Sequence, residues 1–513
     1  MNSSRRTKVG VRVGVAFGLA LTGAVGVGAS GITRADLIAK AYDAVLDARP
    51  DQIEASYREA CGPAPPEACK LLRALATWWT IVQDFHDKSL DPRFLQEADD
   101  AIGAAQAWTS REPARAEAWF YLGASYGVRL QWRGMRGERL SAARDGKRIK
   151  DALERALALE PGLDDAYFGI GLYHYYADVT PAILKFLRFL LLLPGGNRAQ
   201  GLAEMLKARD KGEVLQGEAD YQLQQVYLWY ENRPDRALAL LEGLHTRYPH
   251  NPMFLQLIAE IDDVYLHDVP ASLAAYQQLL RLAERDQVGF ADLAKVRSRL
   301  GLARQWDALA ETDRAIDLLK GVVDAEPASP YGARAKASLD LGTAYDRMGQ
   351  RDEAIAAYRS AIAAAPTDDP DLIRRSASDR LQRRPDARLA EAYRRSLEGW
   401  RLVERGALPD AEHALTQSLE FNPNDPITRY RFGKLLQSRG ERARALDQFE
   451  RAISARPVAP AVTLANAYLE AGRVLEARGN TARAIGMYRS ASEIRGAEPR
   501  TREAASSALA RLR

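Results

Sequence analysis

The sequence predicts an all-α protein built from repeated helix pairs. After Ser30, Ala, Leu, Arg and Glu dominate the composition, and these residues favour helix. No run of alternating apolar and polar residues indicates a strand there. A set of small and aromatic residues recurs at a spacing of about 34 residues, which is typical of stacked helical repeats. Each unit of such an array packs only on its neighbours, so a single core does not limit the length of the array. A chain of 513 residues can therefore consist largely of repeats.

The segment 1–29 differs from the rest of the chain. Four basic residues precede an uncharged stretch over 13–29 that ends in small residues; they are Arg5, Arg6, Lys8 and Arg12. This order predicts a secretory signal peptide at 1–29 and export to the periplasm of a Gram-negative cell. Residues 4–9 also resemble a twin-arginine export signal, although Lys8 stands where an apolar residue is usual. The alternative is an uncleaved membrane anchor, for which the many glycines are unfavourable.

The charge of the chain argues against a nucleic-acid partner. The whole sequence carries a formal charge of +4, and the segment 1–29 holds four basic and no acidic side chains, so the part from Ser30 carries 4 − 4 = 0. Nucleic-acid binding needs a sustained basic surface that displaces counterions.

Residues 30–113 form a predicted N-terminal helical region that contains both cysteines of the chain. Cys61 and Cys69 enclose a Pro-rich segment at 62–68. In an exported protein this spacing predicts a local disulfide between two helices, with two unpaired thiols as the alternative. Too few ligands lie nearby for zinc, so we predict no metal and no cofactor.

The repeat is most complete between residues 336 and 366. Its recurring positions fall at offsets of 0, 3, 4, 7, 16, 20, 23 and 28; they are Ser338, Leu341, Gly342, Tyr345, Ala354, Tyr358, Ala361 and Pro366. Leu341 and Tyr345 share one helix face, and Gly342 leaves room for the second helix. This spacing resembles the tetratricopeptide repeat (TPR) family. The resemblance implies a TPR helix-hairpin solenoid, a right-handed superhelix whose concave groove is lined by the first helix of each pair.

Further copies predict about ten helical pairs between residues 67 and 513. One subarray is expected at 114–366, with insertions at 127–148 and 179–196, and a second at 392–513, ending in a capping helix. Residues 367–391 break the period and are rich in arginine. We interpret them as a solvated connecting segment, with a patch for an acidic partner as the alternative.

The resemblance also implies where a partner binds. The positions that match the groove of the family combine rings and cations; they are Lys336, Arg347, Tyr393, Trp400, Tyr430, Lys434 and Arg473. Such a set suits an extended peptide or an amphipathic helix. The alternative is that several of these side chains only pack on neighbouring helices.

The stretch that begins at Ala182 and ends at Leu193 is the most apolar one after the leader. Its twelve residues are too few to cross a bilayer, which takes about 20. It can rest on a membrane surface, with Lys185 and Arg188 reaching the interface. The alternative is an inserted, buried helix.

No residues form a recognisable catalytic motif. The six histidines are scattered over different units, and no phosphate loop or nucleophile elbow occurs. We therefore predict a non-catalytic scaffold or adaptor of the bacterial cell envelope that binds a protein or peptide in its groove. The alternative is a membrane-associated structural repeat protein, anchored by the leader, by residues 182–193, or by both.

Overall fold

The computed structural model describes residues 31–179, 195–456 and 458–512, and these ranges contain helices and no strand. The N-terminal half contains α1 (Ala35–Leu46), α2 (Pro50–Ala60), α3 (Pro66–Gln83), α4 (Asp91–Arg111), α5 (Ala116–Met135), α6 (Arg139–Leu159), α7 (Ala166–Val179), α9 (Arg198–Lys211), α10 (Gln216–Gln225), the π-helical turn η1 (Val226–Tyr230) and α11 (Pro234–Arg247). The remainder contains α12 (Pro252–Val264), α13 (Val269–Glu284), α14 (Ala291–Ala308), α15 (Thr312–Ala325), α16 (Ala333–Arg347), α17 (Arg351–Ala364), α18 (Ile373–Gln382), α19 (Ala387–Glu404), α20 (Leu408–Phe421), α21 (Pro426–Ser438), α22 (Arg442–Ser454), α23 (Ala461–Ala477), α24 (Thr481–Glu493) and α25 (Pro499–Leu512).

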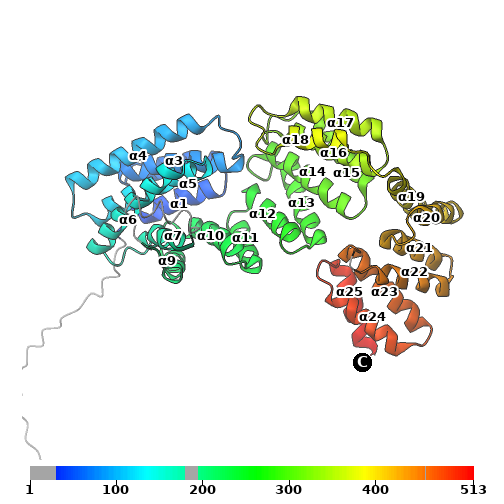
Figure 1. Cartoon of the computed structure of the whole chain (residues 1–513). Coiled ribbons are helices and arrows are strands. Elements are labelled where there is room, and N and C mark those ends of the chain that lie inside the picture. The colour runs from blue at the N-terminus through cyan, green and yellow to red at the C-terminus, as the bar shows by residue number, and fades with distance from the viewer. Residues whose placement is uncertain (1–30, 180–194, 457, 513) are drawn as a thin grey trace, which may run out of the picture.

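The helices form hairpins that follow one another along a curved path (Figure 1). From α3 to α24 the described residues form ten pairs, which confirms the predicted number: α3/α4, α5/α6, α7/α9, α10/α11, α12/α13, α14/α15, α16/α17, α19/α20, α21/α22 and α23/α24. A further hairpin, α1/α2, precedes them, and α18 and α25 stand outside the pairs. The chain is therefore the helix-hairpin solenoid that the sequence predicts. We call the surface formed by the first helix of each pair the inner surface.

Glycines in the first helices allow the two helices of a pair to pack closely. A Cβ atom added to Gly342, Gly433 or Gly472 would lie within 3.0 Å of an aromatic ring on the second helix. The ring facing Gly342 belongs to Tyr358, whose side chain is fully buried. Because a side chain cannot occupy that space, the glycine sets the distance between the helices.

Two segments that interrupt the period are largely helical. Residues 127–148 lie mostly within α5 and α6, which are 20 and 21 residues long, so the extra residues lengthen both helices. Within 367–391, α18 buries Ile373 and Ala377 in the same apolar cluster as α16 and α17. The next large cluster begins at Ala411, so the apolar core is divided close to the end of this segment.

The two cysteines lie on either side of the turn between α2 and α3. The sulfur atoms of Cys61 and Cys69 are paired, and their Cα atoms lie 5.6 Å apart. The Tyr57 hydroxyl on α2 donates a hydrogen bond to the Cys69 carbonyl oxygen on α3. The cysteine pair and this polar contact thus hold the turn together.

The loop after α3 also contacts two loops far along the chain. Asp84 Oδ2 accepts a hydrogen bond from the Tyr331 backbone N–H at 2.8 Å, and Lys88 Nζ lies 2.5 Å from Asp368 Oδ2. These contacts join the first of the ten pairs to the loops that flank α16 and α17. The N-terminal part and the middle of the solenoid therefore touch directly.

The predicted signal peptide at 1–29 and the apolar stretch at 182–193 lie outside the described residues. Among the helices that the structure describes, none is both long enough and apolar enough to cross a membrane.

Candidate partner-binding groove

The inner surface of the N-terminal half is covered by α1. The Tyr42 hydroxyl donates to Glu218 Oε2 on α10 at 2.6 Å and accepts a hydrogen bond of 3.2 Å from Trp79 Nε1 on α3. The Tyr42 side chain is buried. Since α3 and α10 are both first helices of their pairs, α1 lies on the inner surface.

Both ends of α1 are held by other first helices. Before its start, the Thr33 backbone N–H donates to Glu117 Oε1 on α5 at 2.7 Å. At its last residue, the Leu46 carbonyl oxygen accepts a hydrogen bond of 2.7 Å from Nδ2 of Asn251, which directly precedes α12. Asn251 Oδ1 also accepts from Gln83 Nε2 on α3 at 3.0 Å. The segment around α1 therefore spans the inner surface from α5 to α12, and a helix of this chain covers that part of the surface.

In the middle of the solenoid, two predicted residues hold the turn between α14 and α15. Arg347 Nη1 on α16 lies 2.9 Å from Asp307 Oδ2, and the Tyr393 hydroxyl on α19 lies 2.6 Å from Thr312 Oγ1. The Arg347 guanidinium also lies 5.6 Å from the centroid of the Tyr393 ring. The structure thus brings these two predicted residues together, in contact with the chain itself.

Two further arginines, which are not among the predicted residues, also contact this turn. Arg431 on α21 donates from Nη2 to the Ala310 carbonyl oxygen at 2.8 Å, and its guanidinium lies 5.9 Å from the ring centroid of the predicted residue Trp400. Burial lowers the pKa of the Arg431 guanidinium. Arg401 Nε on α19 lies 2.7 Å from Asp313 Oδ2 at the start of α15. The turn between α14 and α15 is therefore anchored to α16, α19 and α21.

Lys336 forms its ion pair within its own helix and not with the other predicted residues. Its Nζ lies 2.6 Å from Asp340 Oδ1 on the same helix, α16, and its side chain remains 45% exposed. This is an ordinary i,i+4 ion pair on a helix surface.

The remaining predicted residues meet on the inner surface of the C-terminal pairs. Lys434 Nζ on α21 and Arg473 Nη1 on α23 each lie 3.0 Å from Glu470 Oε1. Gln437 Nε2 donates to Glu470 Oε2 at 2.8 Å. Burial alone would raise the pKa of Glu470, but Lys434 and the hydrogen-bond donors hold it below its usual range. We call Lys434, Gln437, Glu470 and Arg473 the C-terminal polar cluster.

Tyr430 lies one turn before Lys434 on α21. Its ring centroid lies 6.1 Å from that of Phe449 on the second helix of the pair, and burial raises the pKa of its hydroxyl. Tyr430 thus packs within its own hairpin beside the C-terminal polar cluster. The side chain of Arg473 is 49% exposed and that of Lys434 is 28% exposed. Arg473 is therefore the most accessible cation of the cluster.

No group of three or more His, Cys, Asp or Glu side chains is placed to hold a metal ion in the part of the chain that the structure describes. The polar contacts described on the inner surface are hydrogen bonds and ion pairs, and some of them join repeats that are far apart in the sequence. Their chemistry is suited to recognition of polar groups on another chain.

Comparison with known proteins identifies one of the repeats. Residues 335–368 match the family model described as the tetratricopeptide repeat. No curated protein is detectably similar to this chain in sequence.

Several solved structures align with parts of the chain. A tetratricopeptide repeat protein from Parabacteroides merdae is 16% identical, covers 58% of this chain and 98% of its own, and has a TM-score of 0.27. The apo form of RapI is 12% identical over 82% of this chain and 97% of its own, with a TM-score of 0.29. MamA is 20% identical over 37% of this chain and 93% of its own, with a TM-score of 0.20. At TM-scores this low, none of the alignments establishes a shared arrangement over the whole chain.

The helix pairs, their close packing at glycines and the matched segment all indicate the same fold. The chain is an all-α solenoid of helix hairpins that carries a tetratricopeptide repeat at residues 335–368.

Proposed function

We propose that this chain is a non-catalytic protein-interaction scaffold, and that the inner surface of its C-terminal pairs binds a peptide or a helix of a partner protein. The C-terminal polar cluster is the observation that carries the proposal. It joins two first helices, α21 and α23, and leaves about half of the Arg473 side chain exposed. The place of α1 on the N-terminal inner surface supports the proposal, because a helix fits between such first helices.

The charge of the cluster indicates what kind of group the partner offers. Lys434 and Arg473 share the single carboxylate of Glu470, so the cluster carries a charge of 2 − 1 = +1. A partner carboxylate can bind Arg473 while Lys434 and Gln437 still hold Glu470. We therefore propose a partner segment with an acidic side chain or a free carboxyl terminus.

The proposal is tested by site-specific photo-crosslinking in cells from position 473. The control position is Arg489 on α24, the second helix of the same pair, which is exposed. We expect one protein to be captured from position 473 and not from position 489. Its purified form should then bind the Arg473→Glu variant at least about tenfold more weakly than the native chain, the equivalent of about 1.4 kcal/mol.

The Arg489→Glu variant should bind that partner as the native chain does. Capture of the same proteins from both positions, or equal binding by the Arg473→Glu variant, would contradict the proposed groove.

We further propose that the protein works in the bacterial cell envelope. The basic and apolar pattern of residues 1–29 supports export, and the paired Cys61 and Cys69 suit an oxidising compartment. Release by osmotic shock, with an N-terminus near Ser30, is the expected result of cell fractionation. Extraction only by detergent, with Met1 retained, would instead favour the membrane-associated structural protein that is the alternative.

A further inference from the structure

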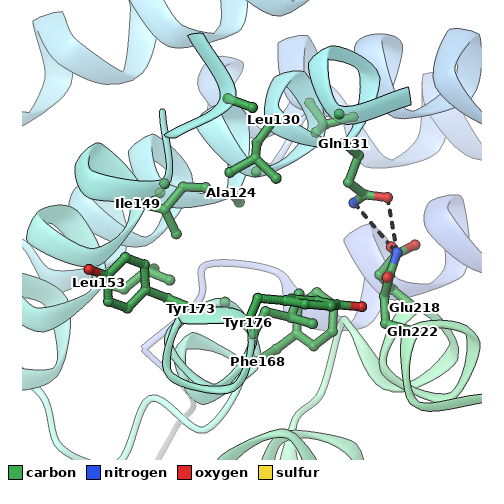
Figure 2. Close-up of a pocket in the computed structure, with 18 of the residues that line it drawn as sticks. Ala124, Leu130, Gln131, Ile149, Leu153, Phe168, Tyr173, Tyr176, Glu218 and Gln222 are labelled. Atoms are coloured by element: carbon green, nitrogen blue, oxygen red, sulfur yellow. Dashed lines mark hydrogen bonds between the residues drawn. The ribbon is translucent and has the colours of Figure 1, made fainter. Parts of the chain in front are cut away.

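A cavity of about 640 Å³ lies between the α5/α6 hairpin, α7 and α10 (Figure 2). Its wall is mostly apolar and includes Leu130 on α5, Ile149 and Leu153 on α6, and Phe168 on α7. A volume of this size falls within the range of about 300–1,000 Å³ that small-molecule sites occupy. The cavity lies outside the C-terminal polar cluster and takes no part in the function proposed above.

Small residues on the lengthened helices keep this space open. Gly127 and Gly134 on α5 line the cavity, and a Cβ atom added to either would meet nothing within 4 Å. By contrast, Gly342, Gly433 and Gly472 on other first helices each face an aromatic ring of the second helix. The space beside α5 is therefore open at these two glycines, Gly127 and Gly134, where the helix carries no side chain.

The cavity has an opening lined by apolar side chains. Leu140 at the start of α6 is 52% exposed, and Tyr230 at the end of η1 is 44% exposed, yet both line the cavity. The π-helical turn η1 continues α10 and brings Tyr230 to this edge. A ligand can therefore enter from the surface between the start of α6 and η1.

One end of the cavity is polar (Figure 2). Glu218 Oε1 accepts hydrogen bonds from Gln222 Nε2 at 3.1 Å and from Gln131 Nε2 at 3.3 Å, and Oε2 accepts from the Tyr42 hydroxyl at 2.6 Å. Glu218 is only 3% exposed, and no Lys or Arg among the described residues pairs with it. Burial raises the pKa of this carboxyl group, because charge is unfavourable there without a counter-ion.

We propose that this cavity binds an amphipathic small molecule with an apolar alkyl or ring body and a protonated amine at one end. The apolar body lies along Ile149, Leu153 and Phe168, and the ammonium group lies beside Glu218. The ammonium supplies the counter-ion that the buried carboxylate lacks. A carboxylate in the same place would set two negative charges side by side, so the polar end at Glu218 favours an ammonium group over the carboxylate of a fatty acid.

Calorimetric titration of the purified full chain with dodecylamine tests this site, with dodecanoate as the anionic ligand of equal chain length. Both are held below the concentration at which they form micelles. At pH 7 we expect one molecule of dodecylammonium to bind per chain, at least about tenfold more tightly than dodecanoate. The Glu218→Gln variant should lose this preference, because it keeps a polar amide but no charge.

Filling the cavity provides the second test. The Gly127→Leu variant should lose binding of dodecylammonium, and Ala124→Leu on the same helix serves if that variant does not fold. The matched control is Gly103→Leu on α4, an exposed glycine that also has nothing within 4 Å of an added Cβ atom and lies outside the cavity lining. This control should bind as the native chain does.

The proposal is wrong if dodecanoate binds as well as dodecylammonium, or if Gly127→Leu leaves binding unchanged, because the ligand then lies elsewhere. It is also wrong if the full chain binds neither ligand. Binding only after deletion of residues 182–193 would likewise overturn it, since the cavity would then be filled by the chain itself.

Discussion

Asp262 on α12 is a buried carboxylate whose ionisation is unfavourable in the folded chain. Its side chain is 7% exposed, and its pKa is raised to about 7 by burial and then by the nearby charges of Asp268 and Glu242. In an unfolded chain the pKa of an aspartate is about 3.9. The folded state therefore binds more protons between these two values, and stability falls as the pH rises through about 7.

We expect the Asp262→Asn variant to be more stable than the native chain at pH 8, by a few degrees in Tm, and to show a smaller advantage at pH 5. The amide carries no charge at either pH, so the variant does not lose the stability that the native chain loses when the buried carboxylate ionises. Thermal unfolding followed by circular dichroism measures the difference. The control is Asp292→Asn on α14, whose side chain is 98% exposed and which should change little at either pH. A Tm difference for Asp262→Asn that does not grow between pH 5 and pH 8 would contradict this account.

Residues whose partners lie close in the sequence could be predicted, and residues with distant partners could not. Gly342 and Tyr358 belong to one repeat, so their spacing alone predicts that they meet. Arg431 contacts Ala310, which lies 121 residues earlier, and no local pattern indicates such a contact. The cavity escaped prediction for the same reason, because residues from α1, α3, α5, α6, α7, α10 and η1 line it together.

At the scale of elements, the same distinction separates the helix pairs from α1. Each pair carries its own packing residues, so the repeat spacing predicts the pairs directly. The sequence of α1 also predicts a helix, but its place depends on α3, α5, α10 and the residues before α12. That surface exists only once the solenoid has folded.

Asn251 is the side chain that best tests how α1 is held. Its side chain is buried and donates a hydrogen bond to the last carbonyl oxygen of α1. It also accepts a hydrogen bond from the Gln83 side chain and one from the Met253 backbone N–H at the start of α12. The Asn251→Ala variant leaves these groups unpaired, which costs about 1–3 kcal/mol. We expect amide hydrogen exchange in residues 35–46 to become faster by at least tenfold, as measured by mass spectrometry.

The matched variant is Asn480→Ala, which removes an exposed cap at the start of α24 and no contact to another hairpin. It should leave exchange in α1 unchanged while exchange at the start of α24 rises. Unchanged exchange of α1 in Asn251→Ala would show that Asn251 does not hold this helix.

At the scale of the whole molecule, Arg431 connects the middle of the solenoid to its C-terminal pairs. The Arg431→Met variant keeps the apolar stem but leaves the Ala310 carbonyl oxygen and the Ser396 hydroxyl without this donor. We expect the C-terminal pairs to move away from the turn between α14 and α15. Small-angle X-ray scattering should then give a larger radius of gyration, and stability should fall by about 1–3 kcal/mol.

The control for this measurement is Arg451→Met on α22. Arg451 forms an exposed i,i+4 ion pair with Asp447, and such pairs contribute about 0.3–0.5 kcal/mol. Its scattering profile should match that of the native chain. A native-like profile for Arg431→Met would show that other contacts are sufficient to set the curvature.

The contacts of α1 also change how the protein is expected to unfold. An array in which each repeat touches only its neighbours can lose pairs one at a time from either end. Here Tyr42 on α1 donates a hydrogen bond to Glu218 on α10, which lies 176 residues later in the sequence. Losing any one of the pairs that α1 contacts removes part of its binding surface and so weakens the others. We therefore expect the N-terminal half to unfold in a single cooperative step, and to refold more slowly than a simple repeat array, because its distant contacts form last.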